Sequence, residues 1–252
     1  MREFLSVENI KLTYQSPDNE TTAIANVSFT VSKGQFVSIV GPSGCGKSTL
    51  LSCIAGLTAP TSGKILLEGK EITDVSTQIG YMLQTDNLFP WRSIYKNVLL
   101  GLEIQKKLTK ENMDYVKELL NKYGLWEFKD SYPSALSGGM RQRAALIRTL
   151  AVRPSLLLLD EAFSALDYQT RVTVSKDVYD ILRAENQTMI MVTHDIPEAV
   201  SMSDKIIVLS NRPATVALTI DTPFSKQRDT LAVRSTSEYL QCYDVVWKEM
   251  SQ

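Results

Sequence analysis

Short apolar runs alternate with longer amphipathic stretches along most of the chain. The runs at 36–40, 79–83, 156–159, 189–192 and 206–209 are typical of buried strands, since a strand covered on both faces shows little polar alternation. The alternation of such strands with helical stretches predicts an α/β domain. Further strand-like patterns, at 4–14 and 24–31, predict an additional antiparallel sheet near the N-terminus.

The pattern becomes mostly helical between residues 93 and 152. The stretch LTKENMDYVKELLNKYG predicts one amphipathic helix, which Thr109 can cap and Gly124 can end. Asn112 stands where a glutamate or glutamine would complete a capping box. The end of the chain, TSEYLQCYDVVWKEM, predicts another amphipathic helix. We interpret the chain as a single domain (1–252) with an α/β core (1–92 and 153–220), an inserted helical subdomain (93–152) and a C-terminal extension (221–252).

The composition is that of a folded globular protein of 252 residues, with 44% hydrophobic residues and a net charge of −1. This charge gives no basic footprint, so nucleic acid is not expected as a partner. Cys45, Cys53 and Cys242 form no even set and no CxxC pair, which favours a reducing, cytoplasmic compartment. No apolar run approaches the roughly 20 residues that cross a bilayer, and the N-terminus is too polar for a signal peptide. We therefore expect that the chain does not cross a membrane by itself.

A buried strand, a glycine-rich loop and a helix follow one another in QFVSIVGPSGCGKSTLLSCIAGL. The loop matches G-x-x-x-x-G-K-[ST], in which backbone N–H groups wrap phosphates, the lysine reaches the β- and γ-phosphates and the hydroxyl binds Mg²⁺. It predicts a P-loop NTPase core with a mixed central sheet. Cys45 could be a redox switch, but nothing indicates a lowered pKa, and a small loop-filling residue is favoured. The predicted nucleotide-binding residues are Gly41, Pro42, Ser43, Gly44, Cys45, Gly46, Lys47, Ser48 and Thr49.

Two carboxylates end the most apolar strand, in SLLLLDEAFSALD. Beside a phosphate loop, Asp160 can hold Mg²⁺, and Glu161 can act as general base on the attacking water. Alone, the pair could equally be a solvated acidic turn. His194, the only histidine, ends the next strand along the chain. Strand ends line the ligand crevice of such sheets, so its imidazole could reach the γ-phosphate; a core or surface histidine is the alternative.

A second segment, ALSGGMRQR, has the pattern of an anion-binding helix start. Ser137, Gly138 and Gly139 precede a helical stretch, so free backbone N–H groups and the helix dipole favour an anion there. Unlike the first loop, this segment has no lysine. One small domain would then carry two phosphate-binding helix starts.

Taken together, and in their order along the chain, these motifs resemble those of the ATP-binding subunits of ABC transporters. The resemblance extends over nearly the whole chain. GPSGCGKST is similar to the Walker A motif, LSGGM to the signature motif and the end of SLLLLDE to Walker B. Three further positions match family motifs: Gln84 the Q-loop glutamine, Asp167 in SALD the D-loop aspartate, and His194 the switch histidine. Tyr14 falls where the family stacks an aromatic ring on adenine, although it could equally be an ordinary strand residue.

The resemblance implies an ATPase that uses Mg²⁺ and works as a head-to-tail pair of subunits, here a homodimer. Each ATP would lie between the phosphate loop of one subunit and Ser137, Gly138 and Gly139 of the other, which explains the missing lysine. The implied catalytic residues are Lys47, Gln84, Glu161 and His194, and the implied metal ligands are Ser48, Gln84 and Asp160. The other implied partners are transmembrane permease subunits, to which Gln84 couples, and an extracytoplasmic solute-binding protein, with the ATPase on the cytoplasmic face of the membrane.

Met140 replaces the glutamine of the common signature LSGGQ, and little loss of activity is expected because the phosphate contacts come from the serine and the glycines. LSGGM followed by RQR resembles the import branch for nitrate, aliphatic sulfonates, taurine and pyrimidine vitamin precursors. The segments LQTDNLFPWRSIYKNV and VLSNRPATV resemble the same branch. Trp91 could contact the membrane subunit or be a core aromatic of the helical subdomain.

Three other functions are considered. A small-molecule P-loop kinase has no role for the signature motif, the D-loop or the switch histidine. A non-transport ABC ATPase acting on DNA or ribosomes would usually carry a coiled coil, zinc-binding cysteines or a duplicated cassette. A scaffold subunit without catalysis is disfavoured by intact Lys47, Asp160, Glu161 and His194.

Overall fold

The computed structural model describes residues 3–16 and 19–251. The strands are β1 (Glu3–Ser16), β2 (Asn19–Ser32), β3 (Phe36–Val40), β4 (Ser62–Leu67), β5 (Lys70–Glu71), β6 (Ile79–Met82), β7 (Leu156–Asp160), β8 (Thr188–Val192), β9 (Lys205–Leu209) and β10 (Ala214–Asp221). The α-helices are α1 (Lys47–Ile54), α2 (Ile94–Ile104), α3 (Lys110–Lys122), α4 (Gly138–Leu150), α5 (Tyr168–Ala184), α6 (Ile196–Met202) and α7 (Ser237–Met250). Three short 3₁₀ helices are η1 (Trp126–Phe128), η2 (Pro133–Ala135) and η3 (Ala232–Ser235).

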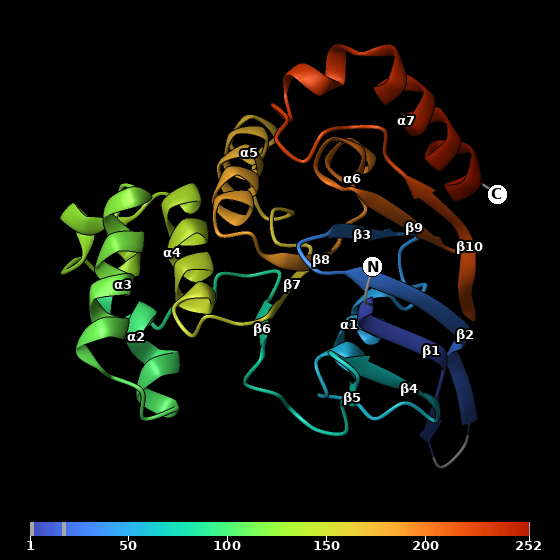
Figure 1. The fold of residues 1–252 in the computed structure, drawn as a ribbon, viewed down its shortest axis with the longest axis horizontal. Helices are drawn as coiled ribbons and strands as arrows, with labels where there is room; N and C mark the ends of the chain where they lie inside the picture. Colours follow the sequence, from blue (N-terminus) through green and yellow to red (C-terminus); the bar gives the residue numbers. More distant parts are fainter. Residues whose placement is uncertain (1–2, 17–18, 252) are drawn as a thin grey trace.

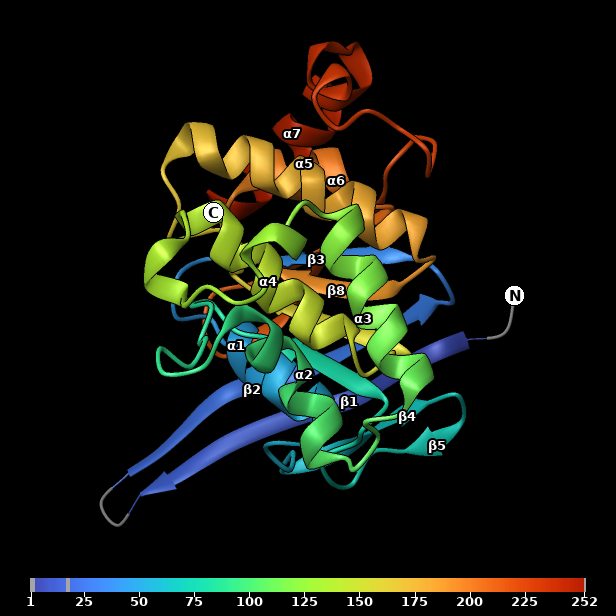
Figure 2. The same ribbon diagram turned by 90° about the vertical axis from the view of Figure 1, so that its left-hand side faces the viewer.

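One curved mixed sheet runs through the molecule in the order β5-β4-β1-β2-β10-β9-β3-β8-β7-β6 (Figure 1). The five strands from β9 to β6 pair in parallel and form the core. Strands β1, β2, β4 and β5 pair antiparallel, and β1 and β2 run as a long hairpin (Figure 2). The predicted core strands and the N-terminal antiparallel strands are therefore confirmed, although β6 ends one residue earlier than expected.

Strand β10, which the sequence pattern did not reveal, connects the two parts of the sheet. It pairs antiparallel with β9 and, at Ala214 and Thr215, in parallel with β2. The N-terminal strands are thus continuous with the core sheet rather than a separate layer. Helix α1 lies in the concave space between the two parts, where Leu50, Leu51 and Ile54 pack among residues of both (Figure 1).

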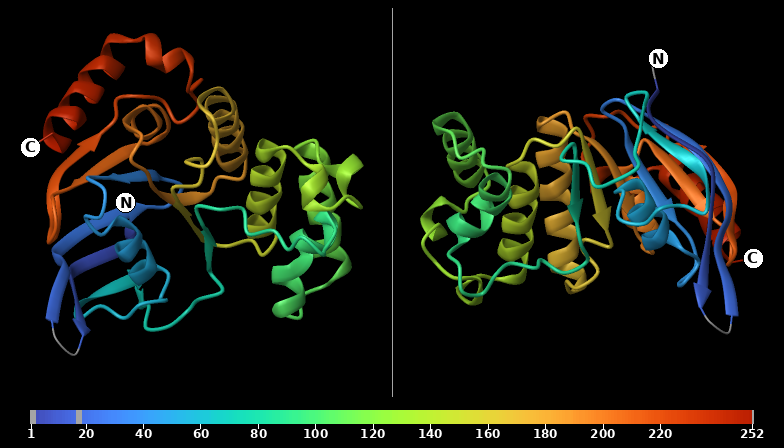
Figure 3. Two further views of the ribbon diagram at one scale, coloured as in Figure 1. Left: turned by 180° about the vertical axis from the view of Figure 1, so that it is seen from behind. Right: turned by 90° about the horizontal axis from the view of Figure 1, so that it is seen from below.

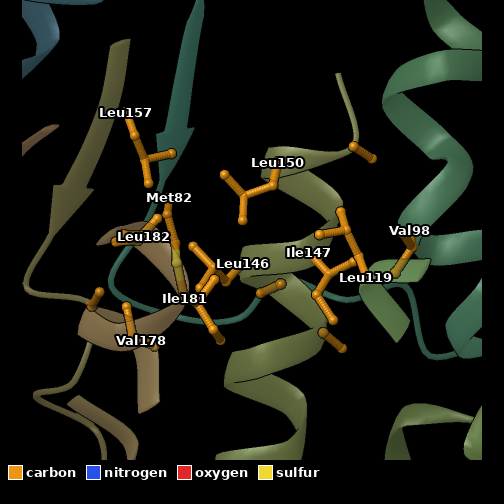
Figure 4. Packing of buried hydrophobic residues seen from close by; sticks show 14 of the residues in the cluster. Met82, Val98, Leu119, Leu146, Ile147, Leu150, Leu157, Val178, Ile181 and Leu182 are labelled. Carbon is orange, nitrogen blue, oxygen red and sulfur yellow. The ribbon is translucent and has the colours of Figure 1, made fainter. Parts of the chain in front are cut away.

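Helices α2, α3 and α4 form a group at one side of the sheet, opposite the N-terminal strands (Figure 3). Helix α4 is the central member of this group. Its Leu146 points towards Met82 and Ile181, while Ile147 points towards Val98 and Leu119, so one helix packs on both neighbours (Figure 4).

The local signals for α3 are confirmed. Thr109 caps it, with its hydroxyl accepting a hydrogen bond from the backbone N–H of Asn112. Gly124 follows the helix end with a φ of 70°, a conformation that glycine adopts without strain. Helix α7 also forms where the terminal pattern predicts it and packs on α6 and β9. Within the described residues, no helix is both long enough and apolar enough to span a bilayer.

Candidate ATP-hydrolysis site

The phosphate loop joins β3 to α1, as predicted. Gly46, immediately before α1, has a φ of 117°, which side-chain-bearing residues rarely adopt. No side chain caps α1, so its first N–H groups face the loop. The buried Lys47 folds over the loop, and its Nζ donates to the carbonyl oxygens of Gly41 at 2.8 Å and Pro42 at 2.9 Å. Positive charge and free donors are therefore concentrated at one helix start.

Cys45 is buried within this loop, and burial raises the pKa of its thiol. A thiol with a raised pKa stays protonated at neutral pH and reacts slowly. Its Sγ would lie 3.0 Å from a Cβ added at Gly41, so it fills the space beside that glycine. The structure thus supports the loop-filling interpretation over a redox switch.

Asp160 ends β7 and joins the phosphate loop to the neighbouring strand. Its Oδ1 accepts from Ser48 Oγ at 2.9 Å, and its Oδ2 accepts from Tyr81 Oη at 3.0 Å. Burial and the adjacent carboxylate raise the pKa of Tyr81, so its phenol remains a donor. Tyr81 was not predicted as part of the site. Its only sequence signal is a hydroxyl-bearing side chain in an otherwise apolar strand.

Ser48 and Asp160 offer the oxygen ligands that Mg²⁺ prefers, and Mg²⁺ usually takes one or two carboxylates together with substrate phosphates. The pair lies directly at the phosphate loop, so these residues fit the ion. Gln84 does not contact either of them. Its Nε2 donates to Ser164 Oγ at 3.1 Å and to Glu161 Oε2 at 3.4 Å, so its role as a metal ligand stays a prediction.

Glu161 follows β7 with a φ of 44°, a left-handed conformation that is strained for a glutamate. Its backbone N–H donates to the carbonyl of Val192 at 2.9 Å, which helps hold this conformation. The carboxylate lies beside two other predicted catalytic residues, with Oε2 3.3 Å from Nδ1 of His194 and 3.4 Å from Nε2 of Gln84. Three elements far apart in the sequence therefore converge on one carboxylate.

Tyr14 lies in β1 beside the phosphate loop. Its Oη donates to Thr49 Oγ1 at 3.4 Å, and the side chain is about half exposed. The ring is thus available near the loop, and its predicted stacking on adenine stays a prediction.

The second helix start lies in a different place. Ser137 caps α4, with its Oγ accepting from the N–H of Met140 at 3.3 Å. A Cβ added at Gly139 would approach Val174 of α5 to 2.9 Å, so close helix packing requires glycine there. Ser137, Gly138 and Gly139 line an open hollow of about 620 Å³ that Gln84 and Asp167 also border. The phosphate loop does not border this hollow, so the fold keeps the two helix starts apart.

Asp167 has a structural role in this chain, because it caps α5. Its Oδ1 accepts from the N–H of Thr170 at 3.1 Å, and hydrogen bonding to Thr170 lowers the pKa of its carboxyl. The aspartate is exposed and borders the same hollow as the signature residues. Its predicted contact with nucleotide stays a prediction.

Two arginines of α4 that sequence reasoning missed hold the segment after Gln84. Arg148 donates to the carbonyl oxygens of Asn87 at 2.6 Å and Asp86 at 2.7 Å. Arg141 donates through Nε to Asp86 Oδ2 at 3.0 Å. The stretch RQR contains Arg141 but not Arg148, and the partners of both arginines lie 55 to 62 residues earlier in the chain.

Trp91 closes the same segment and is 72% exposed, with its ring centroid 5.0 Å from that of Phe89. The interpretation as a core aromatic is therefore wrong, because most of the indole lies outside the packed interior.

The model of the ABC transporter family matches residues 24–164, more than half of the chain, including the phosphate loop, the signature segment and both acidic residues. The chain belongs to the ABC transporter family. It is an ATPase of that family and the ATP-binding subunit of an ABC transporter. The phosphate loop alone would also fit a small-molecule kinase, and the family match favours the ABC ATPase over that alternative.

Three relatives are similar over most of their length. The chain is 47% identical over 98% of its length to the uncharacterized ABC transporter ATP-binding protein YtlC of Bacillus subtilis, of which the match covers 96%. It is 40% identical over 87% of its length to the nitrate import ATP-binding protein NrtD of a Synechocystis species, covering 83% of that protein. It is 38% identical over 89% of its length to the aliphatic sulfonates import protein SsuB of Bacillus thuringiensis, covering 88%.

Among solved structures, the ABC cassette MJ0796 has the same fold. Its dimeric, post-hydrolysis state with ADP and phosphate bound superposes with a TM-score of 0.74 at 30% identity. The match covers 88% of this ABC chain and all of the cassette. The predicted fold class, a P-loop core with N-terminal antiparallel strands and inserted helices, is confirmed.

Proposed function

We propose that this chain hydrolyses ATP to drive import of a small solute, of the nitrate, sulfonate, taurine or vitamin-precursor type, through a separate permease. The observation that carries the proposal is the convergence of Gln84, Glu161 and His194 beside a phosphate loop that contacts Asp160 through Ser48. Support for import comes from the nitrate and sulfonate import relatives. The segment LSGGMRQR resembles the same import branch.

The chemistry follows from the charges at this site. Lys47 and the N-terminal N–H groups of α1 bind the triphosphate of ATP. Ser48 and Asp160 would hold Mg²⁺, which would neutralise charge on the phosphate oxygens. Water attacks the γ-phosphorus while the bond to the bridging oxygen of ADP breaks. Glu161 accepts the proton of that water. His194 and Gln84, both beside the Glu161 carboxylate, keep it and the water oriented.

We infer a head-to-tail pair of identical chains. Within one chain Ser137 and the two glycines border a hollow away from the phosphate loop, so they can meet a nucleotide only on another copy. Such a pair binds ATP more tightly in its closed arrangement, and hydrolysis removes the bridging anion and allows reopening. Residues 1–92 and 153–220 then carry the phosphate loop, residues 93–152 present the signature helix to the partner, and residues 221–252 form an extension.

The pair would act at the cytoplasmic face of the membrane, attached to permease subunits. Gln84 and the exposed Trp91 lie on one segment, which suits it to transmit movement to the permease. A solute-binding protein outside the membrane would supply the solute.

The proposal is tested with the purified chain and its membrane partners. We expect Mg²⁺-dependent release of phosphate from ATP without an organic phosphoacceptor, and co-purification with a polytopic membrane protein. Reconstituted in vesicles with its permease and solute-binding protein, the complex should accumulate the bound solute only with ATP on the ATPase side. Failure to co-purify with any membrane protein, together with retention on nucleic acid, would contradict the transport function.

A further inference from the structure

A buried carboxyl lies behind the loop that carries His194. Glu198, in the first turn of α6, is 5% exposed, and its Oε2 accepts a hydrogen bond from Thr193 Oγ1 at 3.0 Å. Its Oε1 has no hydrogen-bond partner in the part of the chain that the structure describes. Nothing in the proposed hydrolysis step uses this residue.

The Thr193 hydroxyl connects the Glu198 carboxylate to the backbone of Asp195. It accepts a hydrogen bond from the backbone N–H of Asp195 at 3.0 Å while it donates to Glu198. The Asp195 side chain in turn accepts from the backbone N–H of Glu198 at 2.9 Å. Of the two neighbours of His194, Thr193 is therefore held to the start of α6 through the Glu198 carboxylate, and Asp195 is held there through its own carboxylate and through the Thr193 hydroxyl.

The far side of the loop is held by α5. Arg171 donates to Asp195 Oδ2 at 3.3 Å and to the carbonyl of Leu166 at 3.0 Å. Leu166 directly precedes Asp167, so the same arginine contacts the loops of Asp167 and His194. The loop of residues 193–195, called the switch loop here, thus lies between the Glu198 carboxylate of α6 and the Arg171 guanidinium of α5.

The His194 ring itself has little support from packing. Its side chain is 54% exposed, and its contact at 3.3 Å is with the Glu161 carboxylate. A side chain this exposed takes its position from the backbone on either side, which the Thr193 and Asp195 contacts fix. A shift of about 1 Å in such a group can reduce catalysis by roughly 100-fold.

Helix capping is the ordinary explanation for these contacts, since Asp195 and Glu198 have the spacing of a capping box. In that motif the glutamate bonds the N-cap N–H directly, whereas here the Thr193 hydroxyl stands between them. Burial and the nearby Asp195 raise the pKa of Glu198 to about 7, while contacts with Thr193, with Arg171 of α5 and with Arg234 of η3 act to lower it. Keeping this carboxyl ionised in the interior therefore costs free energy. Capping alone would be served by a residue without this cost.

We propose that Glu198 is a positioning residue for ATP hydrolysis, which through Thr193 holds the backbone of the switch loop so that His194 meets the Glu161 carboxylate. This inference rests on the proposed function, because it assumes that His194 takes part in hydrolysis. Glu198 itself contacts neither substrate nor the reacting atoms.

The test compares steady-state hydrolysis by E198A, E198Q and T193V. We expect E198A and T193V to lower kcat by about 10- to 100-fold, with KM for ATP changed by less than about twofold, because the phosphate loop is untouched. E198Q keeps an oxygen acceptor for Thr193 and should retain most of the turnover. The double variant E198A/T193V should be no worse than either single variant, since both break one contact.

The matched control is S203A, at the other end of α6, which removes a buried hydrogen bond with Ser38 away from the switch loop. It should lower Tm and leave kcat unchanged. Wild-type turnover in E198A, an equal loss in E198A and E198Q, or a parallel loss in S203A would each overturn the positioning role. H194A separates the two proposals: normal turnover in H194A refutes the role of His194, whereas a deficient H194A beside a fully active E198A refutes the present inference alone.

Discussion

At the scale of single residues, the site depends on side chains held in costly states. Glu161 has a positive φ of 44°, which costs about 1–3 kcal/mol and persists only because its surroundings hold it. Lys47 is buried but has two carbonyl partners. Glu198 is buried with one oxygen partnered and one without a partner in the described residues. Placing these charged groups therefore offsets part of the favourable free energy of folding.

Replacing Glu161 with glutamine tests the general base. E161Q keeps the size and polarity of the side chain but accepts a proton poorly, so ATP should bind normally while turnover falls by about 100- to 10,000-fold. Calorimetric titration with ATP and single-turnover phosphate release measure the two effects. E118Q, an exposed glutamate on α3, is the control. Turnover near the wild-type rate in E161Q would rule out Glu161 as the base.

The buried carboxyl also makes stability depend on pH. The pKa of Glu198 is raised from 4.5 to about 7, so the folded state binds its proton more tightly than the unfolded state does, and stability is lost as the pH rises between these values. The difference is on the order of 3 kcal/mol. Relative to E198Q, which does not titrate, the wild type should therefore be more stable at pH 5 than at pH 8. Urea denaturation of both proteins at the two pH values measures it, and identical pH dependence would contradict the raised pKa.

At the scale of elements, α4 links the signature segment to the segment after Gln84. It begins at the Ser137 cap, packs at its centre on both helical neighbours and the sheet (Figure 4), and near its end holds two carbonyls through Arg148. Because Arg148 binds that segment, we expect a movement of α4 to displace the segment after Gln84 as well. The helix couples the two ends of the site within one chain.

Removing the Arg148 contact should loosen this segment. R148A leaves two carbonyl oxygens without their charged donor, so we expect a loss of about 2–3 kcal/mol in the free energy of unfolding and faster proteolysis between residues 85 and 93. Lysine should not rescue it, because an ammonium does not reproduce the planar two-donor geometry. R153A, which breaks an exposed pair with Glu111 just after α4, is the control. Equal protease sensitivity in R148A and R153A would refute the anchoring role.

At the scale of the whole molecule, the two predicted anion-binding helix starts lie apart on one chain, which supports the proposed pairing with a second copy. The phosphate loop begins α1 in the concave part of the sheet, and the signature segment begins α4 at the helical side (Figure 1). The signature segment has no lysine, so it is not expected to bind a nucleotide alone. The proposed head-to-tail pair would bring each helix start to the other.

Mixing two inactive variants tests this pairing. In a dimer of one K47A chain and one S137R chain, the head-to-tail arrangement places both lesions in one site and leaves the other site intact. The mixture should therefore hydrolyse ATP well above either variant alone, whereas K47A/S137R mixed with wild type should have one lesion in each site. Phosphate release after co-expression measures the recovery. Failure of the mixture to exceed the separate variants would reject shared sites.

The sequence predicted those features that lie within a few residues of one another. The strand, loop and helix around GPSGCGKST are contiguous, the Thr109 cap acts on Asn112, and the apolar runs give the core strands directly. The place of strand β10 in the sheet escaped prediction because it also pairs with β2, where the partner of Ala214 is Ile24, 190 residues away. Tyr81 and Arg148 escaped for the same reason, as their partners are distant in the chain.

By itself, therefore, the sequence determined the chemistry that this protein can carry: a phosphate loop, a carboxylate pair and a second helix start, each written in adjacent residues. Only the tertiary structure decided which of them meet. It brings Ser48 to Asp160, 112 residues away, and Gln84 and His194 to Glu161, while it keeps Ser137 from the phosphate loop. Hydrogen bonds within a turn follow from local residues. These long-range contacts depend instead on the order of strands in the sheet and on which faces the helices bury.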